Sequence, residues 1–219
     1  MASPPRLYMI PGTGTDRRMY APQLERLADM AIVEWLSPLD IKESLASYGN
    51  RLADTIDTSG RFILGGVSLG GMLAQQMALR LRPAAVLLIA SCSDSKAIAF
   101  LPRMAGKLMR LLPPFATRWQ LDILSLVVMM TRYPHKSLYA RMLKDMPPPL
   151  VRWQSGAATQ WSLAQPLPMP VFHIHGGRDK IIPAGKVQAS AIIPDGGHLI
   201  NVTHADRVND FIMECLRQC

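Results

Sequence analysis

One serine of this 219-residue sequence stands between two glycine pairs, where its hydroxyl could act as a nucleophile. Ser68 is the centre of GGVSLGG (65–71), directly after an apolar run and directly before a helix-like pattern. A nucleophilic serine at a tight strand-to-helix turn needs glycine two positions away on either side, because a side chain there would clash. The alternative is a glycine-rich turn that lets strand and helix pack closely, with Ser68 as a helix cap.

Partners for this serine lie in two loops far downstream. A serine hydroxyl is a weak nucleophile and needs a base, which in turn needs an orienting acid. Asp179 follows an apolar run in HIHGGRD, and His198 follows another in the glycine turn DGGHLI. The order Ser, Asp, His is the one that accompanies such a turn. We therefore predict that Ser68, His198 and Asp179 form a catalytic triad.

Other acids and histidines are weaker candidates for these roles. Asp94, in the loop SCSDS, could supply the acid instead. His204 stands at a helix start, where a capping or surface role is expected, and Asp195 fits a short polar turn. His173 and His175 have a His-x-His spacing, but no third metal ligand accompanies them, so structural histidines are expected.

Acyl transfer also requires amide donors for an oxyanion, each worth roughly 3 kcal/mol. The N–H of Leu69, directly after the serine, is one predicted donor. The other is the N–H of Thr13 in the loop IPGTG (10–14), where two glycines let the backbone approach a ligand closely. Gly12-Thr13-Gly14 could also be a phosphate loop, but without a third glycine or a following Lys-Ser/Thr that evidence is weak.

Apolar runs bounded by turn residues alternate with helix-like stretches along most of the chain. Alternation of this kind predicts parallel strands joined by right-handed crossovers, here an α/β sheet of about six mainly parallel strands. Three- and four-residue apolar spacing predicts helices over 20–30, 43–56 and 70–82 and a closing helix from about Val202, capped by Thr203 and Asp206. Strands are expected at 6–10, 31–36, 61–67, 84–90, 170–175 and 190–194.

The segment 95–165 breaks this alternation and is predicted to be an all-helical lid inserted into a core formed by 1–94 and 166–219. It contains no strand-like run, and prolines at 102, 113–114, 134 and 147–149 should cut it into short helices. Six of the fourteen methionines fall in it, at 104, 109, 129, 130, 142 and 146, which suggests an adaptable apolar pocket.

The excess of positive charge lies entirely in this lid. The chain has a formal net charge of +8, and residues 95–155 hold ten Lys or Arg against two acids, whereas the remainder is balanced. The basic residues could form a solvated outer face, favour acidic substrates or hold the lid against an anionic membrane surface. Nucleic-acid binding is not expected, because no recognisable module accompanies the charge.

Composition bounds the class of protein further. No segment reaches the roughly 18 apolar residues of a membrane span, and the N-terminus lacks the zones of a signal peptide. We therefore expect a cytoplasmic protein. Cys92, Cys215 and Cys219 have no CxxC spacing and are expected to be small buried hydrophobes rather than a disulfide framework.

Four motifs together resemble the α/β-hydrolase family, in particular its small, lidded, esterase-like members. IPGTG resembles the family's oxyanion loop, GVSLGG its nucleophile elbow, HIHGGRD its acid loop and DGGHLIN its histidine loop. The resemblance covers 1–94 and 166–219. It implies the Ser68–His198–Asp179 triad and no metal or organic cofactor.

The sequence departs from the family in three places. Pro11 stands where many members have a histidine. The given sequence begins at the strand that leads to the oxyanion loop, so we expect a sheet without the family's first two antiparallel strands. Asp179 and His198 are only nineteen positions apart, which leaves room for about one helical turn where members usually have a full helix.

The activity implied is that of a serine hydrolase that cleaves a small hydrophobic acyl ester or thioester through an acyl-enzyme. Two alternatives stay open. The acyl group could pass to another acceptor, as in an acyltransferase or a thioesterase-like partner of a biosynthetic pathway. The fold could also bind a ligand without catalysis, because fold does not determine function. A dehalogenase is disfavoured, since its chemistry needs a carboxylate where Ser68 stands.

Overall fold

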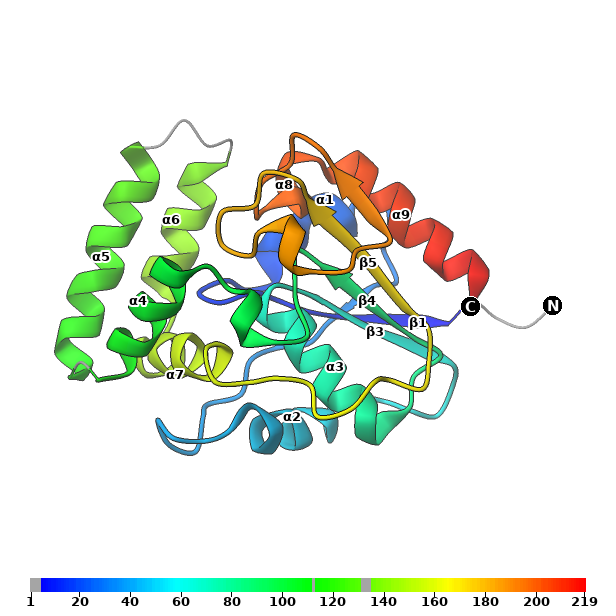
Figure 1. Cartoon of the computed structure of the whole chain (residues 1–219), viewed down its shortest axis with the longest axis horizontal. Helices are drawn as coiled ribbons and strands as arrows, with labels where there is room; N and C mark the ends of the chain where they lie inside the picture. The colour runs from blue at the N-terminus through cyan, green and yellow to red at the C-terminus, as the bar shows by residue number, and fades with distance from the viewer. Residues whose placement is uncertain (1–4, 112, 131–134) are drawn as a thin grey trace.

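The computed structural model describes residues 5–111, 113–130 and 135–219, with a six-stranded sheet at its centre (Figure 1). The strand order is β2-β1-β3-β4-β5-β6 and every neighbouring pair is parallel, which confirms the predicted α/β architecture. The strands are β1 (Arg6–Ile10), β2 (Ala31–Ile32), β3 (Phe62–Val67), β4 (Ala85–Ile89), β5 (Val171–Gly176) and β6 (Ala191–Ile193).

The edge strand β2 is much shorter than the predicted strand over 31–36. It pairs only with β1, where Met9 lies opposite Ile32 and accepts a hydrogen bond from the Val33 N–H. Beyond Ile10, β1 passes into Pro11, which has no N–H to offer a neighbouring strand. The chain after Val33 therefore has no ladder to extend.

Helices cover both faces of the sheet (Figure 1). On one face, α2 (Leu45–Ala53) and α3 (Leu69–Leu81) pack against Tyr8, Ile10 and Leu64. On the other, α9 (Ala205–Gln218) packs with a cluster that includes the alternate strand residues Leu7, Met9 and Ile63. This alternation is the period-two signature of a strand buried on both faces. α1 (Ala21–Leu24), α8 (Ile200–Thr203) and the short 3₁₀ turn η1 (Arg17–Tyr20) lie on the same side as α9.

The helix predicted over 20–30 is wrong in length. Only α1 is α-helical there, because β2 begins at Ala31 and the chain must use residues 25–30 to return to the sheet edge. The predicted helices over 43–56 and 70–82 are confirmed as α2 and α3, and α3 ends at Leu81, just before Pro83.

The predicted closing helix is divided at His204. α8 ends at Thr203 and α9 begins at Ala205, with His204 between them in a non-helical conformation (φ −132°). The expected capping box of Thr203 and Asp206 is wrong, because Thr203 lies inside α8 and its Oγ1 donates back to the Leu199 carbonyl (3.2 Å).

In the described residues, four α-helices are inserted between β4 and β5, as the lack of strand-like runs in this segment predicted. They are α4 (Phe100–Leu111), α5 (Pro114–Met130), α6 (Lys136–Asp145) and α7 (Pro148–Ala158). Pro102 does not break α4, because it is the third residue, where the N–H groups have no intrahelical acceptor. Pro134 lies outside the described residues. The division of the chain at 94/95 and 165/166 into core and lid stays a prediction.

The insertion is held to the core mainly through α7. The Trp153 ring stacks on Tyr48 of α2 with 4.0 Å between ring centroids, and its indole N–H donates to the Glu43 carbonyl (2.8 Å). From α6, Met142 is fully buried against the other core cluster, and Asp145 forms an ion pair with Arg18 (2.8 Å). The second half of the insertion, α6 and α7, is therefore fixed to the core at two places.

Among the described residues, no helix combines the length and the apolar character needed to cross a membrane.

Candidate active site

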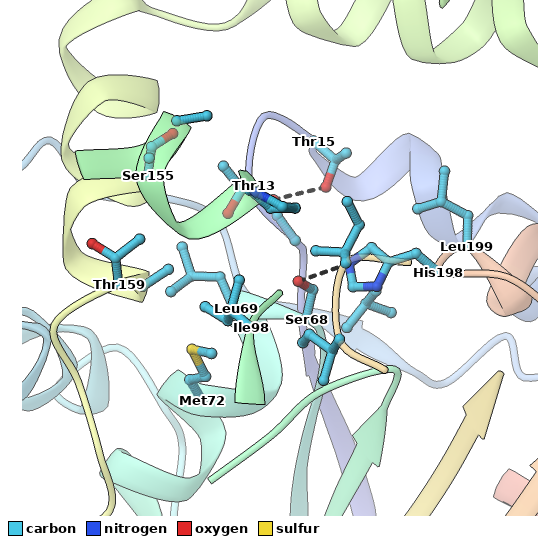
Figure 2. A pocket seen from close by; sticks show the side chains of 18 of the residues that line it. Thr13, Thr15, Ser68, Leu69, Met72, Ile98, Ser155, Thr159, His198 and Leu199 are labelled. Atoms are coloured by element: carbon cyan, nitrogen blue, oxygen red, sulfur yellow. Dashed lines mark hydrogen bonds between the residues drawn. The ribbon is translucent and has the colours of Figure 1, made fainter. Parts of the chain in front are cut away.

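Ser68 lies at the turn between β3 and α3, with a backbone that few side chains adopt. Its φ of 54° and ψ of −118° fall outside the regions that L-residues ordinarily occupy, and such strain costs on the order of 1–3 kcal/mol. The Ser68 N–H donates to the Ile89 carbonyl (3.0 Å), which ties the turn to β4. The side chain is thereby held above the carboxyl end of the sheet (Figure 2).

The two glycines that flank this turn have no room for a side chain. A Cβ on Gly66 would lie 2.3 Å from the Gly70 carbonyl carbon, and a Cβ on Gly70 would lie 2.0 Å from the Ile10 carbonyl oxygen. Both obstacles are backbone atoms, so no side-chain rotation relieves them. The glycine spacing read from the sequence therefore has the steric cause that was expected of it.

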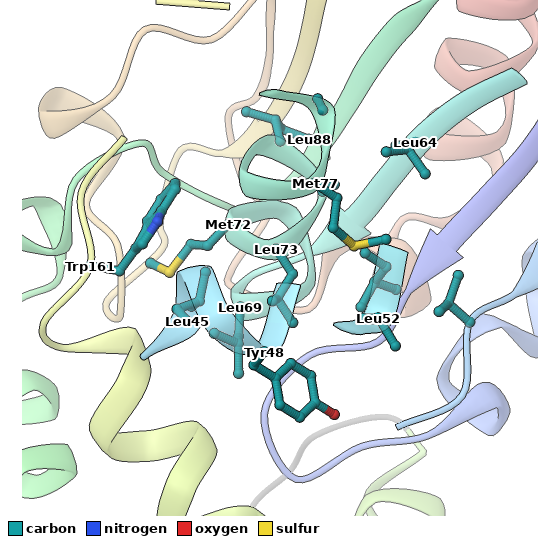
Figure 3. Packing of buried hydrophobic residues seen from close by; sticks show 14 of the residues in the cluster. Leu45, Tyr48, Leu52, Leu64, Leu69, Met72, Leu73, Met77, Leu88 and Trp161 are labelled. Atoms are coloured by element: carbon teal, nitrogen blue, oxygen red, sulfur yellow. The ribbon is translucent and has the colours of Figure 1, made fainter. Parts of the chain in front are cut away.

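Behind the turn, α3 is held by buried packing on α2 (Figure 3). Leu73 and Met77 of α3 lie beside Tyr48 and Leu52 of α2, and all four side chains are fully buried. This packing fixes the helix whose first residue, Leu69, follows the serine.

The three side chains predicted as a triad lie in mutual contact. His198 Nε2 is 3.0 Å from Ser68 Oγ, and His198 Nδ1 is 2.7 Å from Asp179 Oδ2. The dashed line between Ser68 and His198 in Figure 2 marks the first of these contacts. Asp179 follows β5 and His198 follows β6, so parallel strands bring the two loops to the same edge as the serine. The connection between them holds one 3₁₀ turn, η3 (Ala184–Lys186), as the short spacing predicted.

Asp179 is oriented by two sets of hydrogen bonds. Its Oδ1 accepts the N–H groups of Ile181 (2.8 Å) and Ile182 (2.9 Å), which leaves Oδ2 facing His198. Burial by itself raises the pKa of Asp179, but the hydrogen bonds from His175 and His198 outweigh it and hold that pKa well below its ordinary range. The group is therefore a carboxylate at neutral pH.

The loop that carries Thr13 is held by contacts that the sequence did not reveal. The Gly12 N–H donates to Met19 Sδ (3.3 Å), and the Gly14 N–H donates to Gln154 Oε1 of α7 (3.0 Å). Thr15 Oγ1 donates to the Gly12 carbonyl (2.8 Å). The amides on either side of Thr13 are thus engaged, and both Thr13 and Leu69 line the pocket beside Ser68. These contacts support the loop although Pro11 replaces the family's usual histidine.

A pocket of about 350 Å³ opens over Ser68 and His198. Its floor comes from the core and its walls from α4 and α7 of the insertion (Figure 2). The lining is mainly apolar, and its polar members besides Ser68 and His198 are Thr13, Thr15, Ser155 and Thr159. Of the six lid methionines, Met109 lines the pocket, while Met19 and Met72 of the core also do. The lid therefore contributes to an apolar pocket, but most of its methionines do not line it: Met142 and Met146 are buried elsewhere, and Met104, Met129 and Met130 are exposed.

The competing candidates have other partners. Asp94 caps the 3₁₀ turn η2 (Ser95–Ala97) by accepting the Lys96 N–H (2.7 Å). His204 Nε2 lies 3.4 Å from Asp195, at the protein surface. Neither Asp94 nor His204 contacts Ser68 or His198 in the described part of the chain.

His173 and His175 form a buried hydrogen-bonded pair behind Asp179. His173 Nδ1 lies 3.1 Å from the Gln188 carbonyl, and His173 Nε2 lies 3.1 Å from His175 Nδ1. His175 Nε2 lies 2.8 Å from the Ile182 carbonyl and 3.3 Å from Asp179 Oδ2. The pair is structural, as expected, but it also reaches the acid of the candidate site, which the His-x-His spacing alone could not show.

The fold and the four motifs together define an α/β-hydrolase, and comparison of the sequence with known families agrees. Residues 7–211 match the Alpha/beta hydrolase family, and this chain belongs to that family. A search of curated proteins found no similar sequence.

Solved structures with the same fold cover nearly the whole chain. A thermophilic esterase from Thermogutta terrifontis is 18% identical over 100% of this chain and 91% of its own, with a TM-score of 0.75. The enol-lactonase from Burkholderia xenovorans is 17% identical over 98% and 92%, with a TM-score of 0.77. The N-acyl homoserine lactonase AidH is 14% identical over 100% and 90%, with a TM-score of 0.74. At these identities the likeness establishes the fold.

Proposed function

We propose that this protein is a serine hydrolase that cleaves a carboxylic ester or thioester through an acyl-enzyme. The observation that carries the proposal is the continuous contact from Ser68 Oγ to His198 (3.0 Å) and from His198 to Asp179 (2.7 Å) at the floor of an apolar pocket. A hydroxyl, an imidazole and a buried carboxylate in this order are the requirements for an activated serine.

In the first half of the reaction, His198 takes the Ser68 proton as Oγ attacks the substrate carbonyl carbon. The Asp179 carboxylate stabilises the imidazolium, and the N–H groups of Leu69 and Thr13 donate to the oxyanion. The imidazolium then gives its proton to the departing alcohol or thiol, and the acyl group stays on Ser68. In the second half, His198 deprotonates a water molecule that attacks the acyl-enzyme, which releases the acid and restores the serine.

The pocket favours a small hydrophobic acyl group. Its volume of about 350 Å³ and its apolar walls of Met72, Ile98, Met109 and Ala158 suit a short acyl or cyclic ester better than a charged substrate. The similar structures named as an esterase and lactonases share hydrolysis of an ester bond, which is consistent with this substrate class.

The experiment is hydrolysis of p-nitrophenyl butyrate by the wild-type protein, Ser68→Ala and Ser155→Ala. Ser155 is a matched control, because it lines the same pocket without contacting His198. We expect Ser68→Ala to lower kcat/KM on the order of 10³-fold or more, and Ser155→Ala to change it only a few fold. Equal activity of Ser68→Ala and wild type would contradict the proposal.

Added acceptors separate hydrolysis from the alternatives. If an alcohol or amine captures the acyl group in preference to water, the protein is an acyltransferase. Stoichiometric ligand binding without turnover would instead indicate a binding protein of this fold.

A further inference from the structure

Helix α4 of the insertion presents a continuous apolar face to the outside. Five large side chains, each between 46% and 80% exposed, occupy an arc of about 100° around the helix axis. They are Phe100, Leu101, Met104, Leu108 and Leu111. Isolated exposed apolar residues are ordinary, but a contiguous set on one helix face marks a surface that binds something.

The two borders of this face differ in chemistry. Along one border the helix carries Arg103, Lys107 and Arg110, of which Lys107 is exposed. Along the other border lie residues that line the pocket, including Ala105 and Met109. The Arg110 side chain lies over Gly156 of α7, so Lys107 supplies the exposed positive charge at this border. An apolar helix face with a basic border matches the pattern of helices that lie in a membrane interface.

Helix α5 adds a second exposed apolar stripe. Trp119, Ile123, Leu126 and Met130 follow one another at three- and four-residue spacing and are 51% to 79% exposed. Figure 1 shows α4 and α5 at the end of the molecule opposite the C-terminus. An exposed tryptophan on such a stripe is suited to the headgroup region of a bilayer, where its ring is part buried and its N–H is hydrated.

The positive charge of the insertion favours a negatively charged binding partner. Residues 95–155 hold ten basic and two acidic residues, and both acids are paired, Asp122 with Arg118 and Asp145 with Arg18. A second copy docked face to face would bring two such positive surfaces together, which costs free energy. An anionic lipid surface satisfies both the apolar face and the basic border.

We propose that the exposed apolar face of α4 binds the surface of an anionic phospholipid membrane. This inference does not depend on the reaction proposed above.

The test is sedimentation of the protein with vesicles of equimolar phosphatidylglycerol and phosphatidylcholine, and with vesicles of phosphatidylcholine alone. We expect binding to the mixed vesicles that weakens at high NaCl, and little binding to the neutral ones. The double variant Leu101→Gln/Leu108→Gln should lower the partition coefficient about tenfold or more, and Lys107→Glu by about tenfold.

Two exposed residues outside the insertion provide matched control variants. Leu39→Gln removes a side chain that is 70% exposed, and Lys42→Glu reverses an exposed charge, so both should leave vesicle binding within about twofold of wild type. Circular dichroism shows that each variant is folded. The proposal is overturned if wild type does not bind the mixed vesicles, or if the α4 variants bind like the controls. It is also overturned if the wild type self-associates and Leu101→Gln/Leu108→Gln abolishes that, since the face then belongs to a second copy.

The buried pair of His173 and His175 carries a second, independent inference. Three contacts run in series through their rings, and both ends meet carbonyl oxygens, those of Gln188 and Ile182, which only accept hydrogen bonds. Each contact therefore needs one ring N–H, three in all. Two neutral imidazoles carry two, so a fully bonded pair needs one additional proton.

We infer that this pair holds three ring protons and is a buried cation beside Asp179, with the charge on His175. In that arrangement His173 is neutral and accepts from His175 Nδ1–H. Burial, followed by repulsion from His175, lowers the pKa of His173 to about 4, which agrees with a neutral ring there. His175 is then a positioning residue that keeps the Asp179 carboxylate ionised and in place, a role that rests on the proposed function.

Nitrogen NMR of histidine-labelled protein at neutral pH tests the charge directly. We expect both ring nitrogens of His175 to carry a proton and only Nδ1 of His173 to do so; a neutral His175 would overturn the inference whether or not the enzyme is active. For the positioning role, His175→Gln should lower kcat while KM stays nearly constant, and the surface control His204→Gln should change neither. Equal kcat in His175→Gln and wild type would remove that role.

Discussion

Replacing Gly70 with alanine tests the tight turn that presents Ser68. The added Cβ would lie 2.0 Å from the Ile10 carbonyl oxygen and 2.5 Å from the Pro11 carbonyl oxygen. Ordinary carbon–oxygen contacts are more than about 1 Å longer, and both obstacles are backbone, so α3 and the loop after β1 must separate. We expect a loss of about 3 kcal/mol in the free energy of unfolding, at the upper end of the overpacking range.

That loss corresponds to a fall in Tm of roughly 6–12 °C for a chain of this length. Because Thr13 lies only two positions after Pro11, the same displacement should also lower ester hydrolysis by roughly 10²-fold. The measurements are thermal unfolding followed by circular dichroism and kcat/KM for p-nitrophenyl butyrate. Gly60→Ala is the matched control, since a Cβ there meets no atom within 4 Å. If Gly70→Ala melts like Gly60→Ala, the steric account of the turn is wrong.

Three further changes have defined outcomes. Asp179→Asn should lower kcat/KM on the order of 10³- to 10⁴-fold. The folded-state pKa of Asp179 lies below its unfolded value of about 3.9, so the carboxylate stabilises the fold above that pH and this stabilisation is lost as the pH falls. In urea titrations at several pH values, the free energy of unfolding of Asp179→Asn should therefore decrease less on acidification than that of wild type. Burial raises the pKa of the Cys92 and Cys215 thiols to about 12. At pH 8 a disulfide reagent should therefore modify only Cys219 in the folded protein, and Cys92 and Cys215 only after unfolding. Fast labelling of Cys92 or Cys215 in the folded protein would contradict their buried positions. Ala158→Phe should fill part of the pocket and shift the preference among p-nitrophenyl esters toward shorter acyl chains; an unchanged chain-length profile would show that the acyl group binds elsewhere.

The sheet could be predicted from the sequence because its strands are buried on both faces. Runs such as 84–90 are apolar throughout, and a buried parallel strand leaves few other interpretations. The positions of Ser68, Asp179 and His198 followed from the same reasoning, since each lies just past a strand and parallel strands end at one edge. Their catalytic roles stay predictions.

Contacts between distant elements could not be predicted in this way. Gln154 lies 140 positions from Gly14 and reaches its N–H only because α7 folds back over the loop. The short β2 likewise depends on where β1 ends, which is not visible in the sequence of β2 itself. Local propensity carries no information about such partners.

The sequence also could not predict which side of α4 faces solvent. The spacing of apolar residues in 100–111 shows an amphipathic helix, yet the pattern alone does not say which side packs on α7 and which faces solvent. A Cβ on Gly106 would lie 2.8 Å from the Ser155 carbonyl, so this glycine marks the side that packs on α7 and leaves the large apolar side chains outside.

Labelling with a fluorophosphonate, followed by mass spectrometry of the digested protein, tests the central claim most directly. The reagent phosphonylates a serine oxygen only where a neighbouring base has activated it. We predict one modified peptide, with the added mass on Ser68, and loss of labelling in His198→Ala. Modification of other serines at comparable rates, or none at Ser68 in the folded protein, would contradict the account.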